Sequence, residues 1–308
     1  MSHPGPPDTG VLLMAYGSPG SREEIEPYYT DIRRGHPPTP EQLADLVGRY
    51  DAIGGVSPLA ERTERQAVAL QRSLQRAHPG RFTVTVGLKH ASPSIEDGVR
   101  ALAEAGMRRI VGLVMAPHFS ALSIGQYLER ADAAASGLGL PLRGVCRWHL
   151  EPAYVDYLSG AVRAALASLP EGTMTVFTAH SLPERILATG DPYPAELRAT
   201  AAAVADEAGL RAGDWRVAWQ SAGRTPEPWL GPDILAVIDA LAAEGRPGLL
   251  VCACGFVADH LEVLYDLDIQ ARGRAERRGL AFGRTASVND DPSVMDALAG
   301  LVAARALA

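Results

Sequence analysis

Cysteine is scarce in this chain, which has three cysteines among 308 residues. Three cysteines do not make a disulfide framework, and this predicts a reducing compartment, the cytoplasm. Cys252 and Cys254 alternate along an apolar run, and with Cys146 they supply one thiolate fewer than a four-cysteine iron–sulfur cluster needs. We therefore expect all three to be buried apolar side chains.

Excess positive charge and long apolar runs are also lacking. The net charge of −7 and the pI near 5.6 argue against a general nucleic-acid binder, although local basic pockets for an anionic small molecule remain compatible. Apolar runs such as 249–258 fall short of the roughly 18 residues that a membrane span requires. The first eight residues show neither a charged n-region nor an apolar h-region, so we expect a floppy leader and no signal peptide.

Strand-like apolar runs alternate with helical periods along almost the whole chain. The expected strands are 11–15, 82–88, 110–115, 142–148, 173–178, 216–220, 249–254 and 280–284. The expected helices include 61–77, 95–104, 124–135, 153–169, 196–208, 233–243 and 293–306. This alternation predicts an α/β fold of two Rossmann-like lobes, each with a parallel sheet flanked by helices, and an active-site cleft between them. We place the lobes at 1–149 and 150–308, with the final helix 293–306 able to pack back on the first lobe.

One stretch, 249–266, passes from an apolar strand through Gly255 into a polar helical pattern. Glu262, Asp266 and Gln270 lie four apart, so they line one face if the helix is regular. That helix would begin at the carboxyl edge of the sheet, where open α/β folds bind ligands. A row of charges is usually a solvated face, and the alternative is a path for a hard cation such as Fe²⁺ or Mg²⁺.

Histidines follow three of the apolar runs, namely His90, His118 and His180, with His260 as a looser fourth. A histidine at such a position is commonly a helix cap or a satisfied hydrogen-bonding group. The segment His180-Ser181-Leu182-Pro183 favours another role, because Pro183 suits an early helix position and leaves His180 at a strand-to-helix turn. His180 and Glu262 would then converge from two strand ends of one sheet.

The loop 15–20 follows a strand as a phosphate loop does, but it lacks the glycine patterns of dinucleotide and ATP sites. Arg33, Arg34 and Arg49 sit at expected helix ends. There they can interact with the helix dipole, at about 0.3–1 kcal/mol each, or bind an anion. The sequence alone leaves both interpretations open.

The chain resembles the ferrochelatases, which insert Fe²⁺ into a porphyrin. The motifs that carry the resemblance are Thr178 to Pro183, Trp219 to Ser221, Trp229 to Pro232 and Gly255 to Glu262, and the similarity runs from about Val11 to the final helix. It is greatest to the short enzymes of Gram-positive bacteria that act on coproporphyrin III. The resemblance implies two lobes related by an internal pseudo-repeat, with the macrocycle held between them.

The resemblance also implies the roles of individual residues. His180 and Glu262 would be catalytic and would handle the iron and the pyrrole protons, and Tyr16 would be the axial ligand of the product iron. The residues that would contact the macrocycle or its propionates are Arg33, Arg49, Tyr50, Ser57 and Tyr127. Asp266, Trp229 and Arg34 are further candidates. Trp229 and the glycine turn at 54–55 would form walls of the cleft, or they are ordinary core and turn residues.

These residue types suit the chemistry. A neutral imidazole accepts a proton or binds iron, and we expect burial to lower the pKa of His180 below about 6.5. Glu262 would bind the ion or carry protons outward, with Asp266 as the next step. Arginine forks match the four propionates of coproporphyrin, and a bound Fe³⁺ would lower the pKa of the Tyr16 phenol.

Two departures from the family pattern shape the remaining expectations. Gln270 stands where similar enzymes have a third acid, which argues against an outer metal site. No cysteine follows Cys254, so we expect no iron–sulfur cluster and no cofactor beyond the Fe²⁺ substrate. The expected partners are coproporphyrin III, Fe²⁺ and, transiently, the next haem-pathway enzyme, for a monomer that binds neither nucleic acid nor membrane. The rival functions are a protoporphyrin IX ferrochelatase, a chelatase loading cobalt or nickel into another tetrapyrrole, and a non-catalytic tetrapyrrole carrier.

Overall fold

The computed structural model describes residues 7–223 and 225–307. They form two compact units, one made of the chain up to Arg147 together with the segment from Asn289 onward, and the other of Trp148–Val288. The boundary lies two residues before the expected one, and the last helix belongs to the first unit. The eight expected strands are all present.

The first unit is built on a four-stranded parallel sheet with the order β2-β1-β3-β4. Its strands are β1 (Thr9–Ala15), β2 (Phe82–Leu88), β3 (Arg109–Val114) and β4 (Leu142–Val145). All residues of β1 are buried, as a continuous apolar run in the middle of a parallel sheet predicts. The central strand is therefore covered on both faces.

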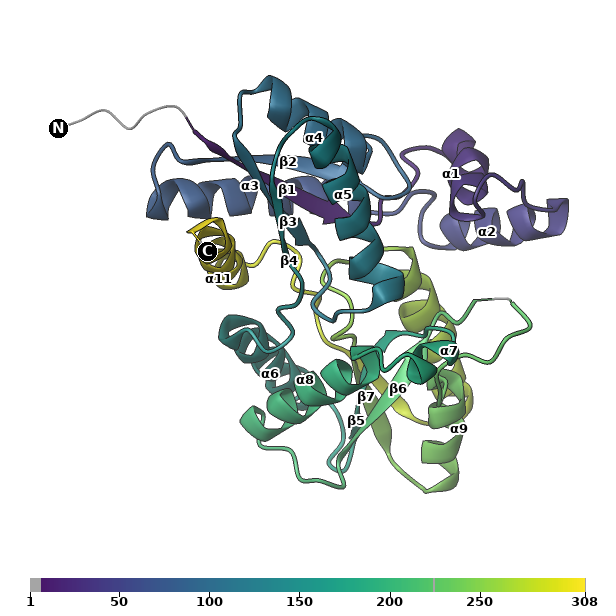
Figure 1. The fold of residues 1–308 in the computed structure, drawn as a ribbon. Helices are drawn as coiled ribbons and strands as arrows, with labels where there is room; N and C mark the ends of the chain where they lie inside the picture. Colours follow the sequence, from purple (N-terminus) through teal and green to yellow (C-terminus); the bar gives the residue numbers. More distant parts are fainter. Residues whose placement is uncertain (1–6, 224, 308) are drawn as a thin grey trace. The chain divides into compact units, whose positions relative to one another are not determined.

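Helices cover both faces of this sheet (Figure 1). The helices of the first unit are α1 (Ile25–Ile32), α2 (Pro40–Ala52), α3 (Leu59–Ala77), α4 (Ile95–Glu104), the π-helix η2 (Ala121–Gly125), α5 (Gln126–Gly137) and α11 (Pro292–Leu307). On one face, Leu12 and Met14 of β1 share a core with apolar side chains of α4 and α5. Helices α1 and α2 form a hairpin that stands away from the sheet in Figure 1.

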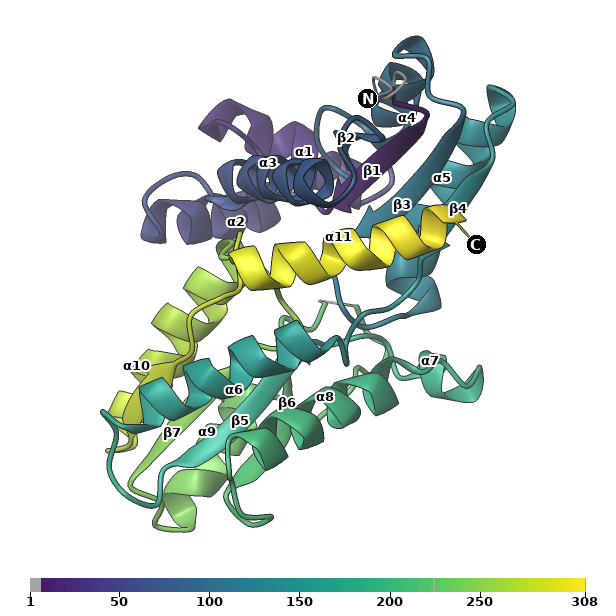
Figure 2. The same cartoon turned by 90° about the vertical axis from the view of Figure 1, so that its left-hand side faces the viewer.

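Helix α11 lies alongside α3 on the other face (Figure 2). Gln66 of α3 donates to the Asn289 carbonyl oxygen over 2.9 Å, and Ser73 donates to Asp296 over 2.5 Å. At the far end, Arg305 donates to the carbonyl oxygen of Gly144, which lies in β4. The last helix thus closes the apolar face that the first 147 residues leave on this sheet.

The second unit repeats the design with a parallel sheet in the order β6-β5-β7-β8. Its strands are β5 (Met174–His180), β6 (Trp215–Gln220), β7 (Gly248–Cys252) and β8 (Ala281–Arg284). Its helices are α6 (Pro152–Leu166), α7 (Arg185–Ala188), α8 (Tyr193–Glu207), α9 (Ile234–Ala243), the π-helix η3 (Val263–Ala271) and α10 (Arg272–Arg277). Helices α9, η3 and α10 share one core with the sheet, and α6 and α8 lie together against β7 and β6 (Figure 2).

In both sheets the strands lie side by side in the order second, first, third, fourth, where the numbers count the strands along that unit's sequence. In such a sheet the chain leaves the first strand in one direction and later returns on its other side, and ligands bind at the carboxyl end of that switch point. In the first unit Tyr16 directly follows β1, and in the second unit His180 ends β5. The repeated topology thus puts Tyr16 and His180 at the carboxyl end of the first strand of each sheet.

The helical segment after Glu262 differs from the expectation of a regular helix. Residues Val263–Ala271 form a π-helix, whose hydrogen bonds span five residues instead of four. The expected helix 124–135 likewise begins as a π-turn before continuing as α5. Among residues 7–223 and 225–307, no helix is both long enough and apolar enough to cross a membrane.

Candidate active site

His180 and Glu262 meet at the carboxyl edge of the second sheet. His180 Nε2 lies 3.5 Å from Glu262 Oε1, and the two side chains are 34% and 35% exposed. His180 is the last residue of β5, and Glu262 precedes η3 at the end of the loop that leaves β7. Since β5 and β7 are neighbours in the sheet, two residues 82 positions apart in sequence become neighbours in space.

Hydrogen bonds hold this pair from several sides. The Tyr193 hydroxyl donates to the His180 carbonyl oxygen over 3.0 Å. Gln220 lies opposite His180 in the register of β5 and β6, and its Nε2 reaches the backbone carbonyl oxygen of Glu262 at 3.4 Å. Thr178 Oγ1 in turn donates to Gln220 Oε1 over 2.9 Å, which fixes the orientation of the amide. Neither Gln220 nor Tyr193 was predicted as a site residue, although the Trp219-Gln220-Ser221 motif placed Gln220 at a strand end.

The protonation state of His180 is the opposite of the expected one. Burial by itself lowers the pKa of His180, but the Glu262 carboxylate, helped by a bond to the Ser181 carbonyl oxygen, raises this pKa to about 9. For Glu262, burial raises the pKa, and the charge and hydrogen bond of His180 outweigh burial and hold the pKa well below its usual 4.5. The Ser181 oxygen can only accept, so Nδ1 carries one proton and the second proton lies between Nε2 and Glu262. At neutral pH the pair is an imidazolium and a carboxylate.

The expected row of acids does not share one environment. Glu262 contacts His180, Asp266 is buried and accepts a hydrogen bond from Ser221, and Gln270 is exposed. Ser221 adopts a positive φ of 58°, which is uncommon for a residue with a side chain and aims its hydroxyl at Asp266. Solvation of a helix face therefore does not explain Glu262 and Asp266.

His260 is a second imidazole beside the same carboxylate. Its Nε2 lies 3.7 Å from Glu262 Oε2, and its ring centroid lies 4.8 Å from that of Phe256. Its Nδ1 lies 3.0 Å from the Ala258 carbonyl oxygen and must donate there, because that oxygen carries no proton. Glu262 therefore lies between two histidines, of which the sequence reasoning assigned only His180 a role.

In the first unit, Tyr16 and His90 lie together at the carboxyl ends of β1 and β2. The His90 backbone N–H donates to the Tyr16 carbonyl oxygen over 3.0 Å, and the two ring centroids are 4.6 Å apart. His90 Nδ1 lies 2.6 Å from Asp31 Oδ2, and burial outweighs this contact and lowers the His90 pKa. Tyr16 itself is 41% exposed, so its phenol is accessible to a ligand.

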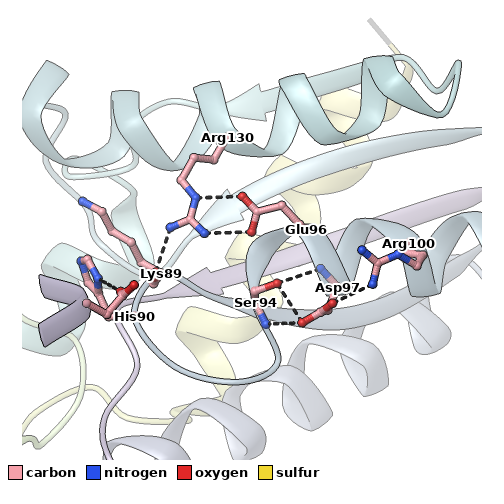
Figure 3. Close-up of polar contacts among 8 residues, drawn as sticks. Lys89, His90, Ser94, Glu96, Asp97, Arg100 and Arg130 are labelled. Carbon is pink, nitrogen blue, oxygen red and sulfur yellow. Dashed lines mark hydrogen bonds and ion pairs between the residues drawn. The ribbon is translucent and has the colours of Figure 1, made fainter. Parts of the chain in front are cut away.

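Next to His90 stands Lys89, the only lysine among 29 basic residues. Its Nζ donates to Gln126 Oε1 over 2.8 Å and lies 5.0 Å from the Tyr127 ring centroid. Burial, followed by the charges of Arg130 and Arg34, lowers the Lys89 pKa to about 8. Figure 3 shows the Arg130 guanidinium forked onto Glu96, with a further nitrogen that donates to the Lys89 carbonyl oxygen.

The other expected porphyrin contacts lie in the first unit with differing exposure. Arg33 ends α1 and lies 5.6 Å from the Tyr29 ring centroid, and Arg34 follows it with a positive φ of 58°. Arg49 donates to Asp45 over 3.0 Å within α2. The remaining three are almost fully buried and present little surface to a ligand in this structure, namely Tyr50, Ser57 and Tyr127.

Trp229 lies in the second unit, on the loop between β6 and α9. Its indole N–H donates to Thr225 Oγ1 over 3.0 Å, and its ring packs so closely on Gly223 that a Cβ there would come within 2.3 Å. The turn at Gly54 and Gly55 in the first unit needs glycine at both positions, where φ is 103° and 102°. Trp229 is thus a half-buried loop side chain, and the glycine pair is a turn.

The cysteines are not all buried. Cys252 and Cys254 are buried, but Cys146, which the expected strand 142–148 would include, lies just beyond the end of β4 at Val145 and is only half-buried. Within the described part of the chain, no three His, Cys, Asp or Glu residues are grouped so that they could hold a metal ion.

The family model of the ferrochelatases matches residues 8–306. This chain belongs to the ferrochelatase family. A coproporphyrin III ferrochelatase from Geobacillus kaustophilus is 46% identical over 303 residues, which cover 96% of this ferrochelatase and 95% of the relative. A coproporphyrin III ferrochelatase from Bacillus subtilis is 44% identical over 300 residues, with coverages of 95% and 96%.

Solved chelatase structures share the fold of this ferrochelatase. SirB from Bacillus subtilis with Fe³⁺ aligns with a TM-score of 0.60 at 12% identity, covering 97% of this chain and 96% of its own. CbiX, described as the terminal enzyme of sirohaem biosynthesis in denitrifying bacteria, aligns with a TM-score of 0.54 at 14% identity, with coverages of 96% and 98%. The two Rossmann-like parallel sheets are thus the fold that this chain shares with SirB and CbiX.

Proposed function

We propose that this ferrochelatase inserts Fe²⁺ into coproporphyrin III to form coprohaem in haem b biosynthesis. The observation that carries the proposal is the His180–Glu262 pair, with Nε2 and Oε1 3.5 Å apart at the switch point of the second sheet. The choice of porphyrin is supported by the relatives at 46% and 44% identity, which are coproporphyrin III ferrochelatases over nearly their full lengths.

In the proposed reaction, Fe²⁺ takes the place of the two pyrrole N–H protons, and the His180–Glu262 pair accepts these protons and passes them on. His180 is protonated at neutral pH, so it must release the Nε2 proton before it can bind iron or accept a pyrrole proton. Glu262 accepts this proton or binds the ion, because carboxylate oxygens can do either. Asp266, four residues further on and buried, would take the proton onward.

Recognition of a porphyrin with four carboxylates is supported by the basic and phenolic side chains of the first unit. Arg33, Arg34 and Arg49 carry forked donors that match carboxylates, and Lys89, the neighbour of His90, adds a further cation. Tyr16, exposed at the end of β1, would bind the iron of the product as a phenolate. Tyr50, Ser57 and Tyr127 are almost fully buried in this structure, so their contacts with the macrocycle stay a prediction.

A comparative insertion assay tests the substrate. We expect faster anaerobic Fe²⁺ insertion into coproporphyrin III than into protoporphyrin IX, and faster insertion of Fe²⁺ than of Co²⁺ or Ni²⁺. Equal or reversed porphyrin rates would favour a protoporphyrin ferrochelatase, and preference for Co²⁺ or Ni²⁺ would favour another chelatase.

Two variants test the assigned residues. His180→Ala should bind porphyrin and lose insertion by orders of magnitude, whereas wild-type protein without any turnover would indicate a tetrapyrrole carrier. Tyr16→Phe should change the absorption of the ferric product, and an unchanged spectrum would remove Tyr16 as an iron ligand.

We further propose a cytoplasmic monomer without an iron–sulfur cluster or other cofactor, which hands its product to the next haem-pathway enzyme in a transient contact. The composition of three cysteines supports the reducing compartment. Size-exclusion chromatography with light scattering tests the monomer, and iron and sulfide analysis of the purified protein tests the absence of an iron–sulfur cluster.

A further inference from the structure

Arg284 occupies the carboxyl end of β8 and is one of the least exposed arginines in an ion pair, with 14% of its side chain accessible. Its Nε and one terminal nitrogen donate to the two carboxylate oxygens of Asp268 over 2.8 and 2.9 Å. The other terminal nitrogen lies 3.3 Å from Asp259 Oδ1 and donates to the Thr285 carbonyl oxygen over 3.0 Å. One guanidinium thus joins two carboxylates that are 19% and 26% exposed.

These two carboxylates bracket Glu262 along the chain. Asp259 lies three residues before Glu262, in the loop from β7, and Asp268 lies six residues after it, in the π-helix η3. Asp259 Oδ1 also accepts from the Ser287 hydroxyl over 2.9 Å. Arg284 therefore fixes the backbone on both sides of Glu262 to the edge of the sheet.

A guanidinium is needed for this geometry because it presents planar donors in fixed directions, so that one side binds a carboxylate through two parallel bonds while the other reaches a second acceptor. An ammonium has the charge but is a point donor, and it does not reproduce the fork. A nine-residue π-helix is rare, and support from outside the helix helps to hold such a segment in place.

We propose that Arg284 is a positioning residue, which sets the location of Glu262 against His180 by fixing Asp259 and Asp268. This inference rests on the proposed roles of His180 and Glu262 in iron insertion. It requires that loss of the fork moves the carboxylate and slows metal insertion, while the porphyrin contacts of the first unit are unaffected.

The same unit contains a matched ion pair away from the His180–Glu262 pair. Arg274 of α10 donates to both oxygens of Asp239 in α9, one of them over 2.8 Å, and the two side chains are 37% and 31% exposed. Arg274→Lys therefore makes the same chemical change in another arginine fork. That fork joins two helices and does not touch the loop that carries Glu262.

The experiment compares Arg284→Lys, Arg274→Lys and wild type in anaerobic Fe²⁺ insertion into coproporphyrin III, with porphyrin affinity from fluorescence quenching and with melting temperatures. Partners that orient metal ligands typically contribute tenfold to a hundredfold to affinity or activity. We expect Arg284→Lys to lower kcat or raise the Fe²⁺ KM by about tenfold to a hundredfold, with porphyrin affinity within about threefold of wild type. Arg274→Lys should leave all insertion parameters unchanged.

Insertion by Arg284→Lys within threefold of wild type, an equal loss in both arginine variants, or a loss confined to porphyrin affinity would overturn the inference. If Arg284→Lys does not fold, Asp268→Asn keeps the side-chain shape and removes the charge that the fork binds, and the same split is expected. Wild-type protein that binds porphyrin but inserts no metal would overturn the proposed function itself, a result distinct from these.

Discussion

Replacing Glu262 by glutamine should change the protonation of His180 more than any other single substitution. In the wild type the carboxylate overcomes burial and raises the His180 pKa to about 9. Glu262→Gln keeps the shape of the side chain and removes its charge, so burial then dominates, and the imidazole should titrate below its ordinary 6.5. At neutral pH and without metal, the neutral imidazole expected from the sequence should therefore form in this variant and not in the wild type.

The size of the effect follows from the pKa difference and from the exposure of the pair. A change from about 9 to 6.5 corresponds to about 3 kcal/mol at 1.36 kcal/mol per unit. Both side chains are about one-third exposed, 34% and 35%, so solvent screens part of this interaction. We expect the pair to contribute between about 1 and 3 kcal/mol to the free energy of unfolding.

The sign of the pH dependence differs for the two partners. The raised pKa of His180 gives a contribution that is complete below pH 6.5 and is lost as the pH rises through about 9. The lowered pKa of Glu262 gives a contribution that is present above pH 4.5 and is lost at lower pH. The stability gap between wild type and Glu262→Gln should thus be widest between pH 4.5 and 6.5 and close above pH 9.

NMR titration of the imidazole C–H signals tests the pKa, with His180→Ala identifying one signal among eight histidines. Urea unfolding at pH 5.5 and pH 9.5 tests the stability gap. A wild-type His180 that titrates near 6.5, or a gap that is the same at both pH values, would refute the reasoning. If iron displaces the Nε2 proton, apparent Fe²⁺ affinity should also rise about tenfold per pH unit between pH 6 and 8.

Two further predictions concern other parts of the site. In protein labelled with ¹³C-lysine, the single Cε signal of Lys89 should titrate near pH 8, and Arg130→Ala should raise the midpoint; a wild-type midpoint near 10.5 would contradict the assignment. Gly255→Ala would place a Cβ 2.3 Å from Ala179 Cβ, next to His180, so we expect a loss of about 1–3 kcal/mol in urea unfolding and slower iron insertion. Stability and insertion rate equal to wild type would show that the two strand ends tolerate separation.

The fold was predictable because its strands are short apolar runs buried on both faces, and such runs are visible in a single sequence. The same reasoning predicted that His180 and Glu262 converge, since residues after neighbouring parallel strands meet at one edge. The sequence pattern could not identify the side chains that hold His180 and Glu262 in place. Gln220 and Tyr193 reach the pair through side-chain directions and strand register, which depend on the folded backbone.

The helix after Glu262 is a π-helix, so the condition for a shared face, a regular helix, is not met. Residues four apart satisfy both an α-helix and the wider π-helix, and a periodic pattern does not separate the two. The expectation of a neutral His180 was wrong. Burial and a nearby carboxylate shift the pKa of an imidazole in opposite directions, and the outcome depends on a separation that a sequence does not contain. At 3.5 Å the carboxylate dominates.

The charged pair has a consequence for the order of events at the metal. An imidazolium repels Fe²⁺, whereas the carboxylate beside it attracts the ion, so the first contact of iron with the pair should be through Glu262. Contact of the cation with Glu262 then weakens the interaction that holds the proton on His180 and lowers the pKa of the imidazole towards the value that burial favours. The arriving metal thereby favours release of the Nε2 proton to solvent, which leaves the neutral base that the pyrrole protons require, and the protein does not need to hold that base free beforehand.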